Sequence, residues 1–432
     1  MNTISIEQLY NIYLQHPMVT TDSRNCPEGS VFFALKGDNF NGNKFASGAL
    51  DSGCSFAVID EPEYAADSRY LLVPDVLTAL QELAAYHRRQ LTIPVIGITG
   101  TNGKTTTKEL TKAVLSAKFN TLATEGNLNN HIGVPLTLLK IRPEHEIAII
   151  EMGANHPGEI EMLCNIADPE YGIITNVGKA HLEGFGSLEG VIKTKTELYD
   201  FLRARNGKVF LHADNPYLPP YAKGLSTIAY GEDKDNLFLW GELTDCTPYL
   251  SFRFKVEKQP AEEVHTQLIG SYNLPNTLAA AAVGAWFGIS PQDIRISLES
   301  YEPANKRSQL VKTEKNTLIL DAYNANPTSM MAALQNFQAM HVAHKMLILG
   351  DMRELGAESA IEHERILEFL DTCDFDRVLL VGPEFNAHPH SFVGLNNISE
   401  LKEWITAHPV SDFHILIKGS RGIALETGIE GL

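Results

Sequence analysis

The sequence lacks long apolar segments and any sign of an export signal. No apolar run approaches the roughly 18 residues that a membrane helix needs. The opening residues, MNTISIEQLY, lack the charged and apolar regions of a signal peptide. We therefore expect a cytoplasmic protein without membrane insertion.

Positive charge is also scarce. The chain has 35 Lys and Arg against 53 Asp and Glu, which gives a formal net charge of −18 at pH 7. Such a chain repels phosphate backbones and anionic lipid, so we expect no nucleic-acid partner. An anionic substrate must therefore be held by local cations.

A cysteine pattern is the third absence. The five cysteines are odd in number, scattered and without the spacing of a metal site. This distribution favours reduced, buried or incidental thiols and argues against zinc. The residues are Cys26, Cys54, Cys164, Cys246 and Cys373.

The chain is long enough for several cores, with 432 residues of which 44% are hydrophobic. We predict an α/β fold of three domains: a small N-terminal α/β domain (1–90), a central P-loop ATPase-like parallel-sheet domain (91–305) and a C-terminal Rossmann-like domain (306–432). From about residue 91 strands alternate with helices, which is typical of a parallel sheet covered on both faces. Residues 207–268 contain short strands and turns, and we expect this stretch to cap the central domain.

The segment VIGITGTNGKTTTKEL has the layout of a phosphate-binding loop. An apolar strand is followed by a turn, Gly100–Gly103, and by a helix that starts at Lys104. Backbone N–H groups and the positive end of the helix dipole would face a polyphosphate, and Lys104 would reach its terminal phosphates. A hydroxyl of Thr105 or Thr106 would ligate Mg²⁺. Ile98 stands where the general pattern has its first glycine, so the match is incomplete.

Polar residues end two further strands that we predict in the central domain. Glu151 follows the apolar run Ile147–Ile150, and His181 follows the run Tyr171–Thr175. Ligands of open parallel sheets bind at the carboxyl ends of strands, so we expect the phosphate loop, Glu151 and His181 to converge on one cleft. A solvated carboxylate and a structural histidine are the alternatives. A triphosphate with Mg²⁺ would give all three a common purpose, since hard cations take oxygen ligands and sometimes imidazole.

Other polar residues are more ambiguous. Asn273 and Asn276 begin a predicted helix, where their amides would cap the helix or contact a base. Lys195 lies on a predicted helix, where lysines are usually solvated. For Asp22–Arg24 and Lys36, which we place in loops, the favoured interpretation is that they are ordinary surface residues.

The C-terminal domain repeats the pattern of apolar strands with polar ends. No G-x-G-x-x-G follows its first strand, which disfavours a dinucleotide cofactor. The polar residues at its strand ends are Asp321, Tyr323, Asn324, Asn326, Asp351, Lys418 and Arg421.

Several motifs spread along the chain occur together: TDSR, FALKG, TGTNGKTTTKE, TEGNLNNHIGVPLTLL, EMGANHPGEI, TNVGKAHLEGFGSLEGVIKTKTELY, GSYNLPNTLAAA, DAYNANPTSM, LGDMRELG and IKGSRG. With them the chain resembles, over essentially its whole length, the Mur ligases. These are ATP-dependent enzymes that add amino acids to the UDP-N-acetylmuramoyl precursor of peptidoglycan. The combination of GNLNNHIGVP, DAYNANP and GDMRELG resembles the member that adds D-alanyl-D-alanine to UDP-N-acetylmuramoyl-tripeptide. The departure at Ile98 is normal for this family.

The resemblance implies roles for individual residues around ATP and Mg²⁺. Lys104 and Thr105 would hold the ATP phosphates and Mg²⁺, while Glu151 and His181 would ligate a second Mg²⁺. Lys195 matches a position that is a carbamylated lysine in this family, where it would help to organise the metal, so Lys104, Lys195 and His181 would be catalytic. The implied nucleotide-binding residues are Gly100, Thr101, Asn102, Gly103, Lys104, Thr105, Thr106, Asn273, Asn276, Arg307 and Asp321.

The resemblance also divides the substrates between the domains. The N-terminal domain would bind the UDP-sugar and the C-terminal domain the amine. The residues implied for the UDP-sugar are Asp22, Ser23, Arg24, Lys36, Asn127, Asn129 and Asn130. Those implied for the dipeptide are Tyr323, Asn324 and Asn326.

The implied reaction activates the tripeptide carboxylate as an acyl phosphate, which the amine then attacks. We expect the protein to be a monomer. The nearest alternative is another Mur-type or folylpolyglutamate-type amino acid ligase, which shares the loop and metal residues. DAYNANP with GDMRELG favours the D-alanyl-D-alanine-adding member. A P-loop regulatory protein that hydrolyses ATP slowly is the alternative from another class. The sequence leaves open whether the third residue of the tripeptide is diaminopimelate or lysine.

Overall fold

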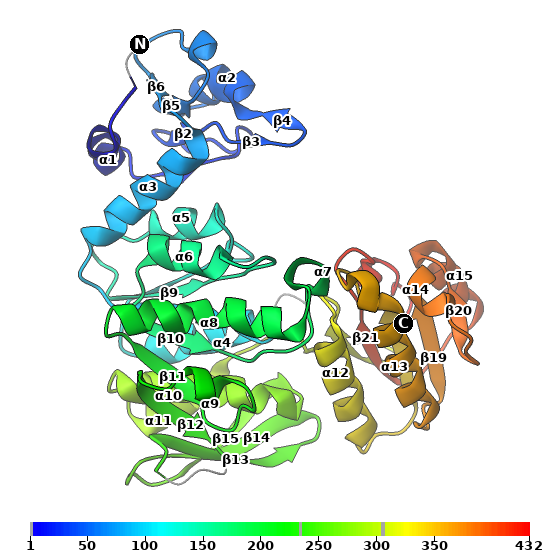
Figure 1. The fold of residues 1–432 in the computed structure, drawn as a ribbon. Coiled ribbons are helices and arrows are strands. Elements are labelled where there is room, and N and C mark those ends of the chain that lie inside the picture. Colours follow the sequence, from blue (N-terminus) through cyan, green and yellow to red (C-terminus); the bar gives the residue numbers. More distant parts are fainter. Residues whose placement is uncertain (1–2, 233–235, 304–306) are drawn as a thin grey trace.

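A computed structural model describes residues 3–232, 236–303 and 307–432, which form three parallel or mixed sheets in chain order (Figure 1). The α/β fold class is confirmed. The predicted division near residue 90 falls between the end of helix α3 at Arg89 and the start of strand β7 at Val95. The division at 305 and 306 lies outside the described residues. No helix in the described ranges is long and apolar enough to cross a membrane.

The N-terminal part contains a four-stranded parallel sheet in the order β1-β2-β5-β6. A small hairpin, β3 with β4, projects sideways from it, on the side of the view where the C-terminal part lies (Figure 1). The strands are β1 Val19–Thr20, β2 Val31–Phe33, β3 Lys36–Gly37, β4 Phe40–Asn41, β5 Phe56–Ile59 and β6 Tyr70–Leu72. The helices are α1 Ile6–Gln15, α2 Ala46–Asp51 and α3 Val76–Arg89.

Helix α3 joins the N-terminal part to the central part through a shared core. Leu80 and Leu83 are fully buried, and they belong to the same hydrophobic cluster as Val134 and Leu138 of the central part. Asp75 caps the helix by accepting a hydrogen bond from the Thr78 N–H at 2.7 Å. Burial of these side chains anchors the N-terminal sheet to the central one.

The central part is built on a nine-stranded sheet in the order β15-β14-β13-β12-β11-β10-β7-β9-β8. Neighbouring strands from β8 to β13 pair in parallel, and β13, β14 and β15 pair in antiparallel fashion. The strands are β7 Val95–Thr99, β8 Thr121–Ala123, β9 Ile147–Glu151, β10 Tyr171–Ile174, β11 Lys208–His212, β12 Ser226–Gly231, β13 Leu239–Cys246, β14 Tyr249–Val256 and β15 Glu262–Ile269. The helices are α4 Lys104–Leu115, α5 Gly133–Leu138, α6 Glu159–Ala167, α7 Leu182–Phe185, α8 Leu188–Ala204, α9 Leu218–Tyr221, α10 Leu274–Trp286 and α11 Pro291–Ser300.

This sheet corrects one expectation. Residues 207–268 do not form a separate cap, because β11 to β15 extend the central sheet edge to edge from β10. The two faces of the sheet carry separate apolar clusters. The central strands are therefore buried on both sides, as a parallel sheet requires.

The C-terminal part contains a six-stranded sheet in the order β16-β17-β21-β18-β19-β20, parallel except for the pair β16 and β17. The four predicted apolar strands are present as β17, β18, β19 and β21, and short strands flank them at both edges. The strands are β16 Gln309–Lys312, β17 Thr317–Asp321, β18 Lys345–Gly350, β19 Arg377–Val381, β20 Val393–Leu395 and β21 His414–Lys418. The helices are α12 Pro327–Ala339, α13 Ser359–Asp371, α14 Pro383–Asn386 and α15 Ile398–Ala407.

Candidate functional site

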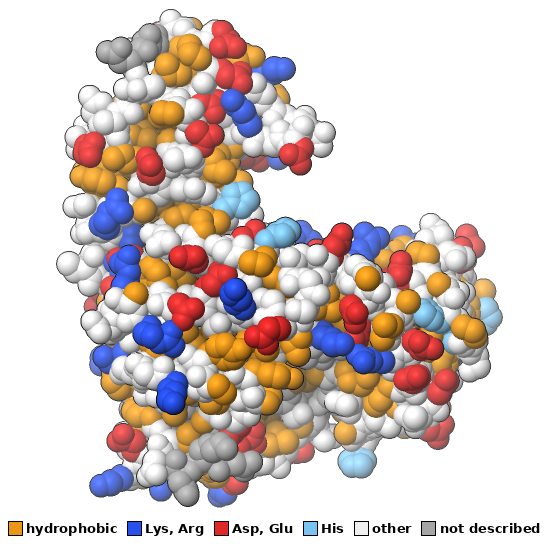
Figure 2. Space-filling view, in the orientation of Figure 1, with side chains coloured by type: hydrophobic (Ala, Val, Ile, Leu, Met, Phe, Trp, Pro, Cys, Tyr) orange, Lys and Arg blue, Asp and Glu red, His pale blue; other side chains and the backbone are white. Residues whose placement is uncertain are grey.

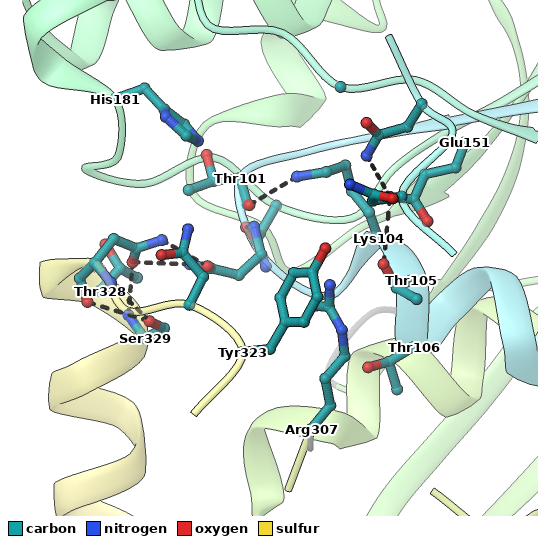
Figure 3. A pocket seen from close by; sticks show the side chains of 18 of the residues that line it. Thr101, Lys104, Thr105, Thr106, Glu151, His181, Arg307, Tyr323, Thr328 and Ser329 are labelled. Carbon is teal, nitrogen blue, oxygen red and sulfur yellow. Dashed lines mark hydrogen bonds between the residues drawn. The ribbon is translucent and has the colours of Figure 1, made fainter. Parts of the chain in front are cut away.

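A cavity of about 540 Å³ lies where the central and C-terminal parts meet. The expected convergence of the phosphate loop, Glu151 and His181 is confirmed, because all of them line this cavity (Figure 3). Strand ends from both sheets reach it, as the rule for open parallel sheets predicts. The predicted site residues in its lining are Thr101, Asn102, Gly103, Lys104, Thr105, Thr106, Asn127, Asn129, Asn130, Glu151, His181, Asn273, Asn276, Arg307, Asp321, Tyr323, Asn324 and Asn326.

Two glycines allow the phosphate loop to take its shape. Gly100 has a φ of 142°, and a Cβ there would lie 2.0 Å from Thr175 Oγ1. Gly103 has a φ of 77°, and a Cβ there would lie 2.6 Å from Asn276 Oδ1. A side chain at either position would strain the backbone and collide with its neighbour. The turn therefore delivers Lys104 to the first position of α4, as predicted.

Lys104 is the cation at the base of the loop. Its Nζ donates hydrogen bonds to the carbonyl oxygens of Gly100 at 2.7 Å and Thr101 at 3.0 Å, the second of which is drawn in Figure 3. Burial lowers the pKa of Lys104 to about 8; the carboxylate of Glu151 opposes this shift and the charge of Arg307 adds to it. The ammonium is poorly solvated, so an anion brought within reach would stabilise its charged form.

Glu151 offers one free oxygen inside the protein. The residue is 1% exposed, and its Oε1 accepts hydrogen bonds from Asn129 Nδ2 at 2.8 Å and Thr105 Oγ1 at 3.3 Å. Its Oε2 is buried without a hydrogen-bond partner among the described residues, and Lys108 Nζ lies 3.9 Å away. An orphaned carboxylate oxygen beside a threonine hydroxyl suits a hard divalent cation.

His181 faces the cavity from a left-handed backbone conformation, with a φ of 49°. Its Nδ1 lies 2.6 Å from Glu354 Oε2, which comes from the C-terminal part. A carboxylate accepts hydrogen bonds, so Nδ1 carries a proton, and in the neutral ring the lone pair is then on Nε2. Within the described ranges no three His, Cys, Asp or Glu side chains gather as a metal cluster. A cation here would take its remaining ligands from hydroxyls, water and phosphate oxygens.

Lys195 is buried, so the solvated alternative for this lysine is wrong. Its side chain is 2% exposed in α8, and its Nζ donates to Ala154 O at 3.2 Å and lies 5.1 Å from the centroid of the Phe185 ring. Burial, and secondarily the charge of Lys104, lowers the pKa of Lys195 to about 7. Lys195 is not in the cavity lining, although Ala154, to which it donates, is. A substantially neutral amine at physiological pH is the form that reacts with CO₂.

The asparagines at the start of α10 hold each other and do not cap the helix. Asn276 Nδ2 donates to Asn273 Oδ1 at 2.9 Å, and Asn276 Oδ1 accepts from Thr107 Oγ1 at 3.1 Å. Asn273 Nδ2 donates to the backbone oxygen of Ile269. The structure shows no side-chain cap at this helix start. The capping alternative is therefore wrong, and both amides lie in the cavity wall.

The C-terminal part supplies an aromatic and charged wall. The guanidinium of Arg307 lies 3.8 Å from the centroid of the Tyr323 ring (Figure 3). Lys418, 2% exposed, forms an ion pair with Asp321. Asn326 caps α12 by accepting from the Ser329 N–H at 2.9 Å, which fixes its backbone at the cavity edge.

The residues implied for the UDP-sugar are divided between two places. Asn127, Asn129 and Asn130 line the cavity, whereas Asp22, Ser23, Arg24 and Lys36 lie in the N-terminal part and do not reach it. Arg24 pairs with Asp22 at 2.9 Å with 88% of its side chain exposed, and Lys36 pairs with Asp60 at 2.9 Å. Figure 2 shows the molecular surface hollowed between the N-terminal part and the rest.

Several charged residues near the site were not predicted from the sequence. Lys108 is fully buried beside Glu151. Its spacing of four residues from Lys104 places both lysines on one face of α4, so the sequence could have predicted that Lys108 lies near the site. Lys179 pairs with Glu362, and Glu354 pairs with His181. Both contacts join the central and C-terminal parts, and nothing in the local sequence indicates these partners.

Comparison with known proteins covers nearly the whole chain. The descriptions "Mur ligase family, catalytic domain", "Mur ligase middle domain" and "Mur ligase, glutamate ligase domain" match residues 16–88, 98–284 and 306–414. The UDP-N-acetylmuramoyl-tripeptide–D-alanyl-D-alanine ligase of Escherichia coli is 37% identical, covering 96% of this chain and 93% of that protein. The enzyme of the same name from Bacillus subtilis is 34% identical, covering 96% and 92%.

A solved structure extends the likeness to three dimensions. MurF ligase from Thermotoga maritima, in complex with ADP, superposes with a TM-score of 0.85 at 26% identity and covers 96% of each chain. The family descriptions, the full-length relatives and this architecture agree. The chain belongs to the Mur ligase family.

Proposed function

We propose that this protein is the ATP-dependent ligase that joins D-alanyl-D-alanine to UDP-N-acetylmuramoyl-tripeptide, giving the UDP-muramoyl-pentapeptide of peptidoglycan synthesis, ADP and phosphate. One observation carries the proposal: relatives bearing this enzyme name match 96% of the chain, the site-forming parts included. The bound ADP in the Thermotoga maritima structure supports ATP as the nucleotide.

The reaction proceeds through an acyl phosphate, as in Mur ligases generally. Joining a carboxylate to an amine in water is uphill, so the terminal carboxylate of the tripeptide first attacks the γ-phosphorus of ATP and ADP leaves. The amine of D-alanyl-D-alanine then attacks the acyl carbon. A tetrahedral intermediate forms, the amine loses a proton, and phosphate leaves as the peptide bond is completed.

The phosphate loop would hold the polyphosphate during the first step. The N–H groups at the start of α4 and the helix dipole attract negative charge. Lys104 would exchange its bonds to the Gly100 and Thr101 carbonyls for phosphate oxygens. Its charge offsets the repulsion between two anions that must approach each other, which is the main electrostatic barrier in phosphoryl transfer.

Magnesium fits the donors around Glu151. We propose that Thr105 would hold one Mg²⁺ at the phosphates, and that Glu151, His181 and a carbamylated Lys195 would hold a second. When bound, Mg²⁺ neutralises negative charge on the phosphoryl oxygens. The contact between Glu354 and His181 Nδ1 orients the imidazole, so Nε2 would be the atom available to the cation.

The remaining residues are proposed for the substrates. Asn273, Asn276, Arg307 and Asp321 would surround the nucleotide, and Tyr323, Asn324 and Asn326 would face the dipeptide. The Asp22–Arg24 loop and Lys36 would hold the UDP-sugar at the N-terminal side, with Asn127, Asn129 and Asn130 on the opposite side. The divisions near 90 and 305, a monomeric state and a cytoplasmic location are also retained as proposals from the sequence.

The test is ADP release in the presence of ATP and Mg²⁺. A ligase of this kind releases ADP only when UDP-N-acetylmuramoyl-tripeptide and D-alanyl-D-alanine are both present. ADP release with ATP alone, at the same rate, would show a slow ATPase instead.

A further inference from the structure

The loop that carries His181 bridges two parts of the molecule. Figure 1 shows α7, which follows His181, lying against the C-terminal part. The Lys179 N–H donates to Thr328 Oγ1 at 3.1 Å, and the Glu183 N–H donates to Glu354 O at 3.4 Å. These backbone contacts tie the loop to the C-terminal part.

The same loop also contacts the phosphate loop, since the Gly178 N–H donates to Thr101 Oγ1 at 3.0 Å. Its contacts on both sides place it between the nucleotide side and the amine side of the cavity.

One ion pair across this junction is buried on its acidic side. Lys179 Nζ lies 2.5 Å from Glu362 Oε1, and the two residues are 183 positions apart in the chain. The Glu362 side chain on α13 is 4% exposed, whereas that of Lys179 is 32% exposed. Arg365, one turn further along α13, also contacts Glu362 Oε1, at 2.6 Å.

The burial of Glu362 gives this contact its importance. A buried carboxylate is costly unless cations and hydrogen-bond donors satisfy it, and removing one partner of a buried pair is strongly destabilising. Arg365 belongs to the same helix and cannot tie two parts of the molecule together. Lys179 therefore makes the contact that joins α13 to the loop beside the phosphate site.

The seating of the C-terminal part also determines the distance between two amide side chains at the site. Across the same junction, Asn326 Nδ2 donates to Asn102 Oδ1 at 2.7 Å and Asn102 Nδ2 donates to Asn326 Oδ1 at 3.3 Å. Asn102 belongs to the phosphate loop, and Asn326 lies on the side proposed for the amine. The separation of these two amides depends on how the C-terminal part is seated on the loop around Lys179.

We propose that Glu362 is a positioning residue for the ligation: by holding Lys179 it seats the C-terminal part against the phosphate loop and brings the amine towards the activated carboxyl group. The proposal rests on the proposed function for the identity of the reaction. Glu362 is not among the residues that line the cavity, and it would act on the site through Lys179.

The test compares Glu362→Gln with Lys179→Met. Both should lower kcat about 10- to 100-fold, because misplacement of reacting groups by an ångström has an effect of that order. The KM for UDP-N-acetylmuramoyl-tripeptide should stay within about threefold of the wild-type value, since the residues proposed for that substrate lie in the N-terminal and central parts. The double variant should lose no more than the worse single variant, because the two side chains act as one unit.

Two controls separate this role from a local one on α13. Arg365→Ala removes the partner on the same helix, and Glu364→Gln changes an exposed neighbour. Both should keep kcat within about twofold of wild type: Glu364→Gln is a surface substitution, and in Arg365→Ala the Glu362 carboxylate keeps its ion pair with Lys179. Lys179→Met leaves α13 intact, so its result does not depend on whether Glu362→Gln folds well.

Small-angle X-ray scattering of the unliganded proteins supplies a measurement without turnover. Lys179→Met should have a larger radius of gyration than Arg365→Ala. The proposal is supported if kcat falls in both single variants without additivity and the radius increases; any other pattern overturns it. Failure of the wild type to make product would overturn the proposed function, and the scattering comparison would still decide the seating of the two parts.

Discussion

Lys104 carries its charge where water is scarce. Burial lowers its pKa to about 8, and its Nζ is held by the carbonyl oxygens of Gly100 and Thr101. Such a lysine is poised to exchange neutral acceptors for phosphate oxygens, which stabilise the ammonium far better. Its charge and its position both suit the role proposed for it, which is to bind the terminal phosphates of ATP during phosphoryl transfer.

Removal of this charge should abolish ligation. We expect Lys104→Ala to lower turnover by at least about 100-fold, because the helix dipole cannot replace a positioned cation at the terminal phosphates. ADP release with all substrates measures the loss. Lys112→Ala, at an exposed position of the same helix, is the matched control and should behave like the wild type. Wild-type turnover in Lys104→Ala would contradict the ATP assignment.

The pH dependence follows from the lowered pKa of Lys104. The side chain is charged below its pKa and neutral above it, so kcat/KM for ATP should fall as the pH rises through about 8. Lys104→Arg keeps its charge at all accessible pH values, although its geometry differs. Whatever activity it retains should lack the falling limb near this pH. A profile that stays flat to pH 10 in the wild type would contradict the role of the Lys104 charge.

Lys195 should act as a carboxylate. With its pKa lowered to about 7, the amine is largely neutral at pH 8, the form that would react with CO₂. Lys195→Ala should therefore be nearly inactive and partly rescued by acetate or formate, which restore the missing oxygens. The assay follows turnover against carboxylate concentration at fixed ionic strength, with chloride as the control. A flat response from a near-wild-type variant would show that Lys195 is not carbamylated.

At the scale of elements, the turn between β7 and α4 determines where the phosphate loop points. Gly103 has a φ of 77°, and a Cβ would approach Asn276 Oδ1 to 2.6 Å, so the turn depends on both glycine and the amide behind it. Asn276 in turn is held by Thr107 and Asn273. The loop is shaped by α10 as well as by its own sequence.

Gly103→Ala should destabilise the protein by about 1–3 kcal/mol, because a non-glycine residue in this conformation is strained and its Cβ meets Asn276. Thermal unfolding measures the change. Gly48→Ala, in α2 with open space around the added Cβ, is the control and should be neutral or slightly stabilising. Equal stability of the two variants would contradict the described turn.

A substitution in the N-terminal part should weaken the binding of UDP-N-acetylmuramoyl-tripeptide and not that of ATP. Arg24→Ala should raise the KM for UDP-N-acetylmuramoyl-tripeptide about tenfold, since charge-assisted contacts to phosphate contribute on the order of 1.5–3 kcal/mol. The KM for ATP should change little. Arg69 pairs with Asp67 two residues before it, as Arg24 does with Asp22, so Arg69→Ala is a matched control. Equal losses for both substrates in Arg24→Ala would remove this division of labour.

At the scale of the whole molecule, local sequence patterns predicted the strands that end at the site but not their partners. The apolar runs before Glu151 and His181 predicted two parallel strands, and the strand-end rule then predicted their convergence. The membership of β11 to β15 in the same sheet was missed, because an apolar strand does not specify its neighbours in sequence. The burial of Lys195 and the pair Lys179 with Glu362 were invisible for the same reason, since distant residues create them.

The arrangement of the three sheets is consistent with the proposed division of three substrates among the parts of one chain. Arg24 lies in the N-terminal part, the phosphate loop in the central part and Asn326 in the C-terminal part. The cavity lies between the central and C-terminal parts. Closure of such a cavity excludes water from a reactive acyl phosphate. The proposed ligation would therefore use all three parts of the molecule.

The purified protein is incubated with ATP, Mg²⁺, D-alanyl-D-alanine and UDP-N-acetylmuramoyl-tripeptides whose third residue is diaminopimelate or lysine, and the products are identified by mass spectrometry. We expect a UDP-muramoyl-pentapeptide whose mass is the sum of the two substrates less one water, with one ADP released per product. Preference between the two tripeptides would identify the third residue. Addition of a single amino acid in place of the dipeptide, or ADP release without any such product, would contradict the proposed ligase.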